Sequence, residues 1–273
     1  MPPVLLQQSK HQETLSLPST VMTDEELQSQ LASLTEPEWI ELQLRARWEL
    51  AKNDPLEFMK WFVFSLDPKD KRQPIKPFPA HRPHIQQMSR LWLETYNRSL
   101  LVRSPKTGEM IENTGMVLDK CRQIMATWFG CCVSLWDVLF HRGRLVFLQT
   151  KREEDAIGNE DAAAGLLGRC KFILRHVPGI EMLEPQLDMK TNFQSNKIVF
   201  PHLNSMLWAI PEGGDIIRSH TPSGVFSDEC NFQPEFGNAY AAFIAGLRGG
   251  GWFYGCSSAH PGRFYDLCHD RLR

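Results

Sequence analysis

The sequence lacks several features that would assign a partner or a compartment directly. Its seven cysteines include no C-x-x-C pair, so the spacing of a zinc ribbon is missing. Lys and Arg number 30 against 32 Asp and Glu, so no global basic field indicates nucleic acid. No apolar run approaches the roughly 20 residues of a membrane span. The N-terminus also lacks the basic region followed by a continuous apolar segment that is typical of a signal peptide. We therefore expect reduced thiols in a cytoplasmic protein, no membrane partner, and DNA contacts only through local basic patches.

The first part of the chain is predicted to be a flexible tail followed by a helical arm. Residues 1–20 are polar and rich in Pro, Ser and Gln. Helical signals fill residues 21–75 and begin with Thr23 and Glu26 in capping-box spacing. One helical face collects apolar residues at helical period, namely Trp39, Leu42, Ala46 and Leu50. The arm ends at the Pro- and Lys-rich stretch DPKDKRQPIKPFPAHRP, so we expect a separate domain over residues 76–273.

Strands alternate with helices in this second region. Predicted strands lie on both sides of a turn at 106–108 and at 144–150, 197–200, 205–210, 224–229 and 251–258. Predicted helices lie at 127–140 and 235–247, and a long polar helix begins at Arg152. Such alternation implies an α/β fold, with a mostly parallel central sheet flanked by helices.

One strand-to-helix turn, LDKCRQIMATWFGCC, has the layout of a phosphate-binding loop but not its sequence. The standard pattern is G-x-x-x-x-G-K-[ST], between a strand and a helix. On residues 120–127, the glycine positions hold Lys120 and Met125, and the lysine position holds Ala126. Only Thr127 matches the pattern. By pattern alone this turn is not a nucleotide site, because it has no glycine and its lysine stands at the front.

The chemistry of the turn suits an anion better than its pattern does. Backbone N–H groups before a helix, together with the helix dipole, attract phosphate. Thr127 can place a hydroxyl on Mg²⁺, Lys120 can reach the β- and γ-phosphates along its flexible stem, and Arg122 adds a second cation. The alternative is an ordinary turn whose lysine and arginine are solvated. The candidate nucleotide-binding residues are Lys120, Cys121, Arg122, Gln123, Ile124, Met125, Ala126 and Thr127.

Two further strand ends carry residues suited to nucleotide hydrolysis. The strand in SGVFSDEC ends in Asp228, a candidate for Mg²⁺-bound water, and Glu229, a candidate for polarising the attacking water. Alternatively, the two carboxylates cap the next helix. The strand in GWFYGCSS ends in Ser257 and Ser258, which either sense the γ-phosphate or simply form a turn. Loop, acidic strand and polar-tipped strand come in the order expected of a P-loop ATPase of the additional-strand type.

Four stretches between residues 80 and 273 together carry a resemblance to a known family. They are KCRQIMATW, LFHRGRLVFLQTKREEDA, SGVFSDECNFQPEF and AYAAFIAGLRGGGWFYGCSSAHPGRFYDL. Their combination resembles the N-terminal ATPase domain of the tailed-bacteriophage terminase large subunit, a viral DNA-packaging motor. Some members of that family carry the loop lysine at the front of the motif. The resemblance therefore implies that Lys120 is a displaced phosphate lysine and that Thr127 lies on the Mg²⁺ side.

The resemblance also assigns roles to the strand ends. It implies that Asp228 is the metal-side carboxylate and that Glu229 is the catalytic one. Ser257 and Ser258 would form the motif that couples phosphate loss to movement. The implied activity is ATP hydrolysis, with ATP and Mg²⁺ as the bound groups.

Three other residues take their roles from the resemblance alone. Arg122 resembles a loop arginine that acts in cis on the γ-phosphate. Arg218 resembles an arginine that some members offer to a neighbouring subunit, and such a group can be worth about 10³–10⁵ in rate. Gln86 or Gln87, in the stretch FPAHRPHIQQM, resembles a residue that contacts adenine, although either also fits the surface of a helix.

The partners that the resemblance implies are double-stranded DNA, a portal protein and a small terminase subunit. The chain would work in a homo-oligomeric ring on the portal, with a monomer in isolation as the alternative. Its place would be the cytoplasm of the infected bacterial host and, transiently, the viral procapsid. The family's C-terminal nuclease domain is absent from this chain, so we do not expect DNA cleavage.

Basic stretches supply candidate DNA contacts, and two rival functions remain open. The stretches are HRGR, KREED, GRCKFILRH and LRGGG, which would bind phosphates without sequence preference or would simply be solvated. One rival is a superfamily-2-like helicase, or another DNA-dependent ATPase with the same core. The other is a nucleotide-dead assembly module with a degenerate phosphate loop.

Overall fold

The computed structural model describes most of the chain beyond the N-terminal tail. The described residues are 33–97, 101–103, 110–112, 115–121, 124–247 and 250–269, with Gln28, Leu31 and Gly108 as single positions. By its contacts the chain divides into two compact units, Met1–Gln43 and Leu44–Arg273. None of the helices among these residues is long and apolar enough to cross a membrane. The predicted tail lies outside the described residues, and the predicted boundary at residues 75 and 76 stays a prediction.

Helix α2 (Glu36–Asn53) does not bury the apolar face that its sequence predicts. The large members of that face are exposed: Trp39 by 43%, Leu42 by 41% and Leu50 by 60%. The helix instead buries Trp48, whose ring centroid lies 4.9 Å from that of Phe62 in α3 (Pro55–Phe62). The exposed face and the face that carries Trp48 are both apolar. The face that contacts the aromatic rings of α3 is the one that is buried.

The segment after α2 leads the chain onto the central sheet. Helix α3 begins at a capped turn, where the Asp54 carboxylate accepts a hydrogen bond from the Leu56 N–H at 2.8 Å. The next elements are β1 (Phe64–Leu66), β2 (Ile75–Pro77) and α4 (Pro83–Tyr96), and β1 pairs with β2 antiparallel. Helix α4 is anchored by Trp92, which is fully buried with its ring centroid 5.4 Å from that of Trp252.

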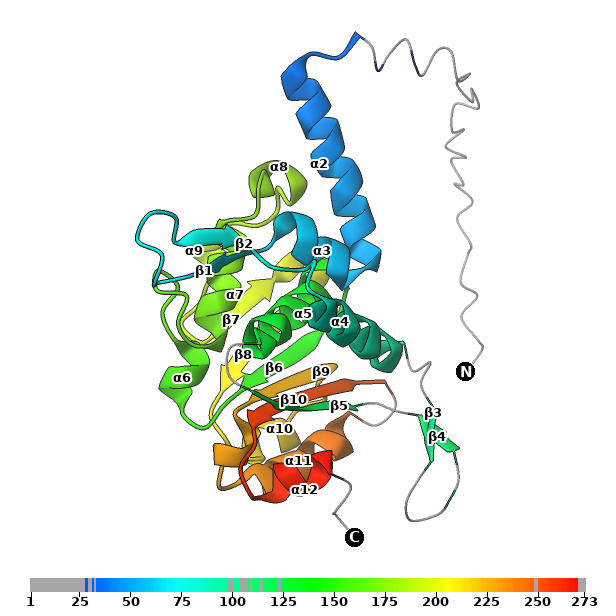
Figure 1. Cartoon of the computed structure of the whole chain (residues 1–273), viewed down its shortest axis with the longest axis vertical. Coiled ribbons are helices and arrows are strands. Elements are labelled where there is room, and N and C mark those ends of the chain that lie inside the picture. The colour runs from blue at the N-terminus through cyan, green and yellow to red at the C-terminus, as the bar shows by residue number, and fades with distance from the viewer. Residues whose placement is uncertain are drawn as a thin grey trace, which may run out of the picture. The chain divides into compact units, whose positions relative to one another are not determined.

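The core of the second unit is a six-stranded sheet (Figure 1). In spatial order its strands are β5 (Gly115–Lys120), β10 (Trp252–Ser258), β9 (Gly224–Asp228), β6 (Leu145–Gln149), β8 (Ser205–Ile210) and β7 (Lys197–Phe200). Neighbouring strands run parallel, except that β7 pairs with β8 antiparallel. Strand β10 thus lies between β5, which leads into the glycine-free turn, and β9, which ends in Asp228. The predicted α/β fold, with its additional strand, is confirmed.

Helices cover both faces of this sheet (Figure 1). One face carries α5 (Ala126–Phe140) and α7 (Leu166–Arg175), and the other carries α10 (Asp215–Arg218), α11 (Phe236–Gly246) and α12 (Arg263–Cys268). The remaining elements are β3 (Leu101–Arg103), β4 (Met110–Glu112), α6 (Glu153–Ile157), α8 (Ile180–Leu183), α9 (Met189–Asn192) and the 3₁₀ turns η1 (Pro201–Leu203) and η2 (Cys230–Phe232). Successive residues of β10 serve the two faces: Tyr254 joins the α5 core, and Phe253 joins the α11 core.

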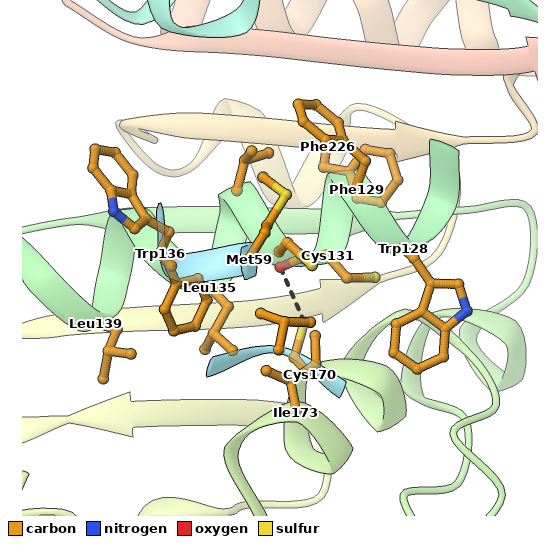
Figure 2. Close-up of a cluster of buried hydrophobic side chains, with 14 of the residues drawn as sticks. Met59, Trp128, Phe129, Cys131, Leu135, Trp136, Leu139, Cys170, Ile173 and Phe226 are labelled. Atoms are coloured by element: carbon orange, nitrogen blue, oxygen red, sulfur yellow. Dashed lines mark hydrogen bonds between the residues drawn. The ribbon is translucent and has the colours of Figure 1, made fainter. Parts of the chain in front are cut away.

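Helix α5 is buried along almost its whole length, because it lies between the sheet and α7. Figure 2 shows Phe129 of α5 beside Phe226 of β9, and Cys131 beside Cys170 of α7. The Cys170 thiol donates to the Cys131 carbonyl oxygen at 3.7 Å. A Cβ atom on Gly130 would collide with the Phe226 ring, so glycine lets α5 lie this close to the sheet. The close approach brings the start of α5 to the end of β9.

The predicted long helix from Arg152 is wrong. The structure has the short α6, a loop, and then α7. Gly158 and Gly165 bound this loop with φ of +65° and +68°, conformations that favour glycine and that end a helix. A Cβ on Gly158 would collide with the Ala164 carbonyl oxygen, so the two ends of the loop pack backbone against backbone.

Candidate functional site

The glycine-free turn joins the last residue of β5, Lys120, to the first residue of α5, Ala126. Met125 precedes the helix with φ +63° and ψ +17°, in the left-handed region. This is the position at which the standard loop has its second glycine, and a non-glycine residue there costs about 1–2 kcal/mol. No side chain of the described residues caps α5, so its first N–H groups stay available to an anion.

Lys120 points from the front of the turn toward the acidic strand end. Its Nζ lies 3.0 Å from Glu229 Oε1 and 3.5 Å from Asp228 Oδ1, and the lysine side chain is only 10% exposed. Burial works to lower the pKa of Lys120, but attraction to Asp228 and the hydrogen bond to Glu229 outweigh it, so the pKa lies above its ordinary value. A full positive charge is therefore held beside both carboxylates.

Thr127 and Asp228 form the second half of this cluster. The Thr127 hydroxyl donates to Asp228 Oδ2 at 2.7 Å. The other carboxylate oxygen of Asp228 accepts from the Glu229 N–H and from the Cys256 thiol, both at 3.0 Å. These contacts fix a buried carboxylate at the end of β9, facing the first turn of α5.

The donor set fits Mg²⁺ better than a transition metal. Among the described residues, no group of three or more His, Cys, Asp or Glu side chains is placed to hold a metal ion. A cation here would take oxygen from Thr127 and Asp228, and the rest from phosphate and water. Mg²⁺ prefers that arrangement, because it keeps several waters and binds few protein oxygens.

Glu229 occupies an unusual backbone position directly after β9. Its φ and ψ are +52° and +43°, in the left-handed region, and its side chain is 41% exposed. Non-glycine residues rarely adopt this conformation, and such strain clusters at functional sites. The turn aims the Glu229 carboxylate back across the sheet edge, where Oε1 meets Lys120 and Oε2 lies 3.5 Å from the Ser257 hydroxyl.

The tip of β10 is linked to Glu229 through a residue that the sequence did not single out, Asn231. Ser257 is fully buried, and its hydroxyl accepts from the Asn231 N–H at 3.1 Å. The Asn231 amide group donates to the Ser258 carbonyl oxygen at 3.0 Å and accepts from the Tyr265 N–H at 2.9 Å. Asn231 therefore ties the turn after Glu229 to both β10 and α12.

A cavity of about 620 Å³ opens at this edge of the sheet. Lys120, Asp228, Glu229 and Ser258 line it from the strand ends. Its far wall includes Arg169 of α7, a residue that sequence analysis placed only in a basic stretch. A cavity of this size suits a small ligand such as a nucleotide.

The other predicted site residues lie outside this cluster. Gln86 is exposed on α4, and Arg218 is exposed on α10 with its guanidinium 2.7 Å from Asp215. Neither lines the cavity. Cys121 is exposed, whereas Ile124 is half-buried. Two of the predicted loop residues, Arg122 and Gln123, lie outside the described residues.

Two cations of the predicted basic stretches are already paired inside the protein. Arg144 makes a two-point ion pair with the fully buried Asp137, at 2.8 and 3.0 Å. Asp137 also accepts from the Trp252 indole at 2.8 Å. Arg175 lies 2.8 Å from Glu160. The charge of Arg144 therefore stabilises the core and is not free to bind DNA.

The strand order, with β10 inserted between β5 and β9 and with helices on both faces, is that of the P-loop NTPase fold of the additional-strand type. No family model matches the chain, and no curated protein does. Among solved structures it is similar to the large terminase of bacteriophage HK97, at 14% identity and a TM-score of 0.47, over 76% of this chain and 37% of that one. It is also similar to the large terminase of a thermophilic bacteriophage in complex with ADP, at 16% identity and a TM-score of 0.35, over 61% of this chain and 37% of that one.

A third similar structure is the large terminase ATPase domain of Thermus phage P74-26. The identity is 12% and the TM-score 0.37, over 56% of this chain and 62% of that one. This chain thus spans less than two thirds of each of these proteins. All three proteins are large terminases.

Proposed function

We propose that this chain is the ATPase domain of a DNA-packaging motor of the terminase large-subunit type, and that it hydrolyses ATP to move double-stranded DNA. The observation that carries the ATPase part is the meeting of Lys120 with Glu229 beside the Thr127–Asp228 pair. The resemblance of four sequence stretches to that family supports the packaging part. The fold alone would serve many nucleotide hydrolases.

The phosphates of ATP are proposed to bind at the uncapped N-terminus of α5, where N–H groups and the helix dipole favour negative charge. Thr127 and Asp228 would hold Mg²⁺, which neutralises charge on the β- and γ-phosphates when it is bound. Lys120 would add its own charge from the front of the turn. The loop thus replaces the standard order of residues but keeps the same charges around the phosphates.

Lys120 and Glu229 are proposed to separate when ATP binds. In the structure the Lys120 ammonium lies 3.0 Å from Glu229 Oε1, so a base at Glu229 would first have to lose this ion pair. A triphosphate carries more negative charge than the acidic pair and competes for the lysine. When Lys120 turns to the phosphates, Glu229 becomes free to act as a base.

Hydrolysis then follows the chemistry of water attack. Glu229 orients a water and takes its proton, while the water oxygen bonds to the γ-phosphorus. The bond from that phosphorus to the bridging oxygen breaks, and ADP leaves with the oxygen. Loss of the phosphate changes the charge beside Glu229, which Ser257 and Asn231 connect to β10 and α12.

Substitution of Glu229 tests the ATPase proposal. We expect Glu229→Gln to lower kcat by about 10²–10⁴-fold, because a positioned base contributes that much, while Mg·ATPγS still binds. Turnover should be measured at high protein concentration with Mg²⁺ and double-stranded DNA. Glu181→Gln, on the exposed surface of α8, is the matched control. Equal turnover in wild type and Glu229→Gln would rule out this base, and no binding of Mg·ATPγS by wild type would favour the assembly module.

The DNA-moving role needs its own assay. A packaging motor should show ATPase activity that double-stranded DNA stimulates and that rising salt suppresses, since the contacts would be to phosphates. It should move duplex DNA when combined with a portal protein and a small terminase subunit, as it would in an infected bacterial cell. Unwinding of a tailed duplex would favour the helicase rival instead.

A further inference from the structure

Arg169 stands in the cavity wall across from Lys120. It lies on the first turn of α7, whose N-terminal residues Gly165 and Leu166 also line the cavity. One guanidinium nitrogen donates to the Gly165 carbonyl oxygen at 3.0 Å. The group lies 5.7 Å from the ring centroid of Trp128, which belongs to the first turn of α5. Both contacts hold the guanidinium between α7 and the start of α5.

Arg169 makes no ion pair with any carboxylate that the structure describes. Its Nε is buried and meets no hydrogen-bond acceptor there. Three carboxylates line the same cavity: Asp228 and Glu229 lie next to Lys120, and Asp155 makes no ion pair with Arg169. Arg175, six residues further along α7, is in contrast paired with Glu160. A half-buried cation without an anion is unfavourable, and an anionic ligand would remove that penalty.

The strand order shows which part of a nucleotide Arg169 would meet. Strand β9, which leads to Glu229, lies between β10 and β6. Lys120 enters from the β5 and β10 side, whereas Thr150 and Lys151, at the end of β6, line the cavity on the other side with Arg169. A terminal phosphate opposite Glu229 would therefore have Lys120 on one flank and Arg169 on the other.

We propose that Arg169 contacts the terminal phosphate of the bound nucleotide and stabilises its charge during hydrolysis, from within the same chain. This inference rests on the proposed function, because it assigns a residue to the same site. Arginine suits the task, since its planar guanidinium can bind phosphate oxygens at two points. Lys151 lines the same wall, but it is exposed and would supply only a solvated point charge.

The test compares Arg169→Gln and Arg169→Lys with Arg175→Gln, a matched control on the same helix. Binding of Mg·ATPγS and of ADP should be measured by calorimetry, alongside turnover. We expect Arg169→Gln to weaken Mg·ATPγS by about 10–100-fold, the worth of a charged hydrogen bond, and to lower kcat by about 10³-fold. ADP should bind as it does to wild type, which also shows that the variant is folded. Arg169→Lys should recover part of the loss, and Arg175→Gln should lose nothing.

The two proposals fail in different ways. Wild-type turnover that needs Glu229 but not Arg169 would overturn the Arg169 inference and leave the ATPase proposal standing. Equal weakening of ADP and Mg·ATPγS in Arg169→Gln would also overturn it, because the contact would not be to the terminal phosphate. Arg169-dependent binding of Mg·ATPγS without any turnover would support the contact and contradict hydrolysis. No binding of either nucleotide to wild type would overturn both.

Discussion

Two loops of this protein place residues at positive φ, one without glycine and one with two. The turn before α5 puts Met125 at φ +63° and ψ +17°, whereas the loop between α6 and α7 puts Gly158 and Gly165 at φ +65° and +68°, with ψ of −156° and −178°. Gly158 has no room for a Cβ, because its backbone packs on Ala164. Met125 has room, and its side chain packs against the core. Glycine is thus required where the backbone takes a conformation open to glycine alone and also meets a second backbone, whereas the turn before α5 holds a half-buried methionine in the left-handed region.

The largest expected effect comes from Gly158→Ala. The new Cβ would collide with the Ala164 carbonyl oxygen, and alanine would also be strained at φ +65° and ψ −156°, so the free energy of unfolding should fall by about 3 kcal/mol. Thermal unfolding should show a Tm lower by roughly 10 °C. Gly143→Ala is the matched control, because Gly143 has φ +68° and open space around its Cβ position. If both variants lose the same amount, the close packing does not explain this glycine.

A smaller change in stability is expected from substitutions of Met125, in the glycine-free turn before α5. Met125→Val should lower the free energy of unfolding by about 1 kcal/mol, because a branched Cβ fits the left-handed region less well than an unbranched one. Met125→Gly relieves the strain but gives up the methionine packing and adds about 0.5–1 kcal/mol of backbone entropy. Its stability in chemical denaturation should therefore stay close to wild type. A large stabilisation by glycine would mean that the methionine contributes no packing.

The smallest effect concerns cysteine labelling in the same turn. Cys121 is exposed and should react readily with a maleimide, whereas Cys256 is buried. Burial and the nearby Asp228 raise the pKa of the Cys256 thiol well above its ordinary value, so Cys256 should stay unlabelled at neutral pH while the protein is folded. Mass spectrometry would locate the label. Mg·ATPγS should slow the labelling of Cys121. Equal labelling rates with and without the nucleotide would mean that Cys121 does not lie near the bound phosphates.

The fold, and the meeting of Lys120 with Asp228 and Glu229, could be predicted because both depend on the order of strands and on the residues that follow each strand. Apolar strands followed by Lys120, by the Asp228–Glu229 pair and by Ser257 can be found along the chain, and parallel strands bring their ends to one edge. The break between α6 and α7 was missed, although two glycines in AIGNEDAAAGLL mark it.

Other features need coordinates. Helical periodicity could not predict that α2 buries Trp48 and exposes the face of Trp39 and Leu42, because burial depends on which face contacts the aromatic rings of α3. Arg169 looks like one more cation in a basic stretch until α7 is placed against α5. The opposite holds for Arg144, whose partner Asp137 is hidden in the core.

We propose that Lys120, at the front of a glycine-free turn, neutralises a triphosphate opposite Glu229. A crystal structure with Mg²⁺ and a non-hydrolysable ATP analogue would show this contact. We expect Lys120 Nζ to leave Glu229 and to bond to the β- or γ-phosphate, with Thr127 and Asp228 on the metal side. A complex in which Lys120 stays on Glu229, or in which the phosphates bind away from the start of α5, would contradict it.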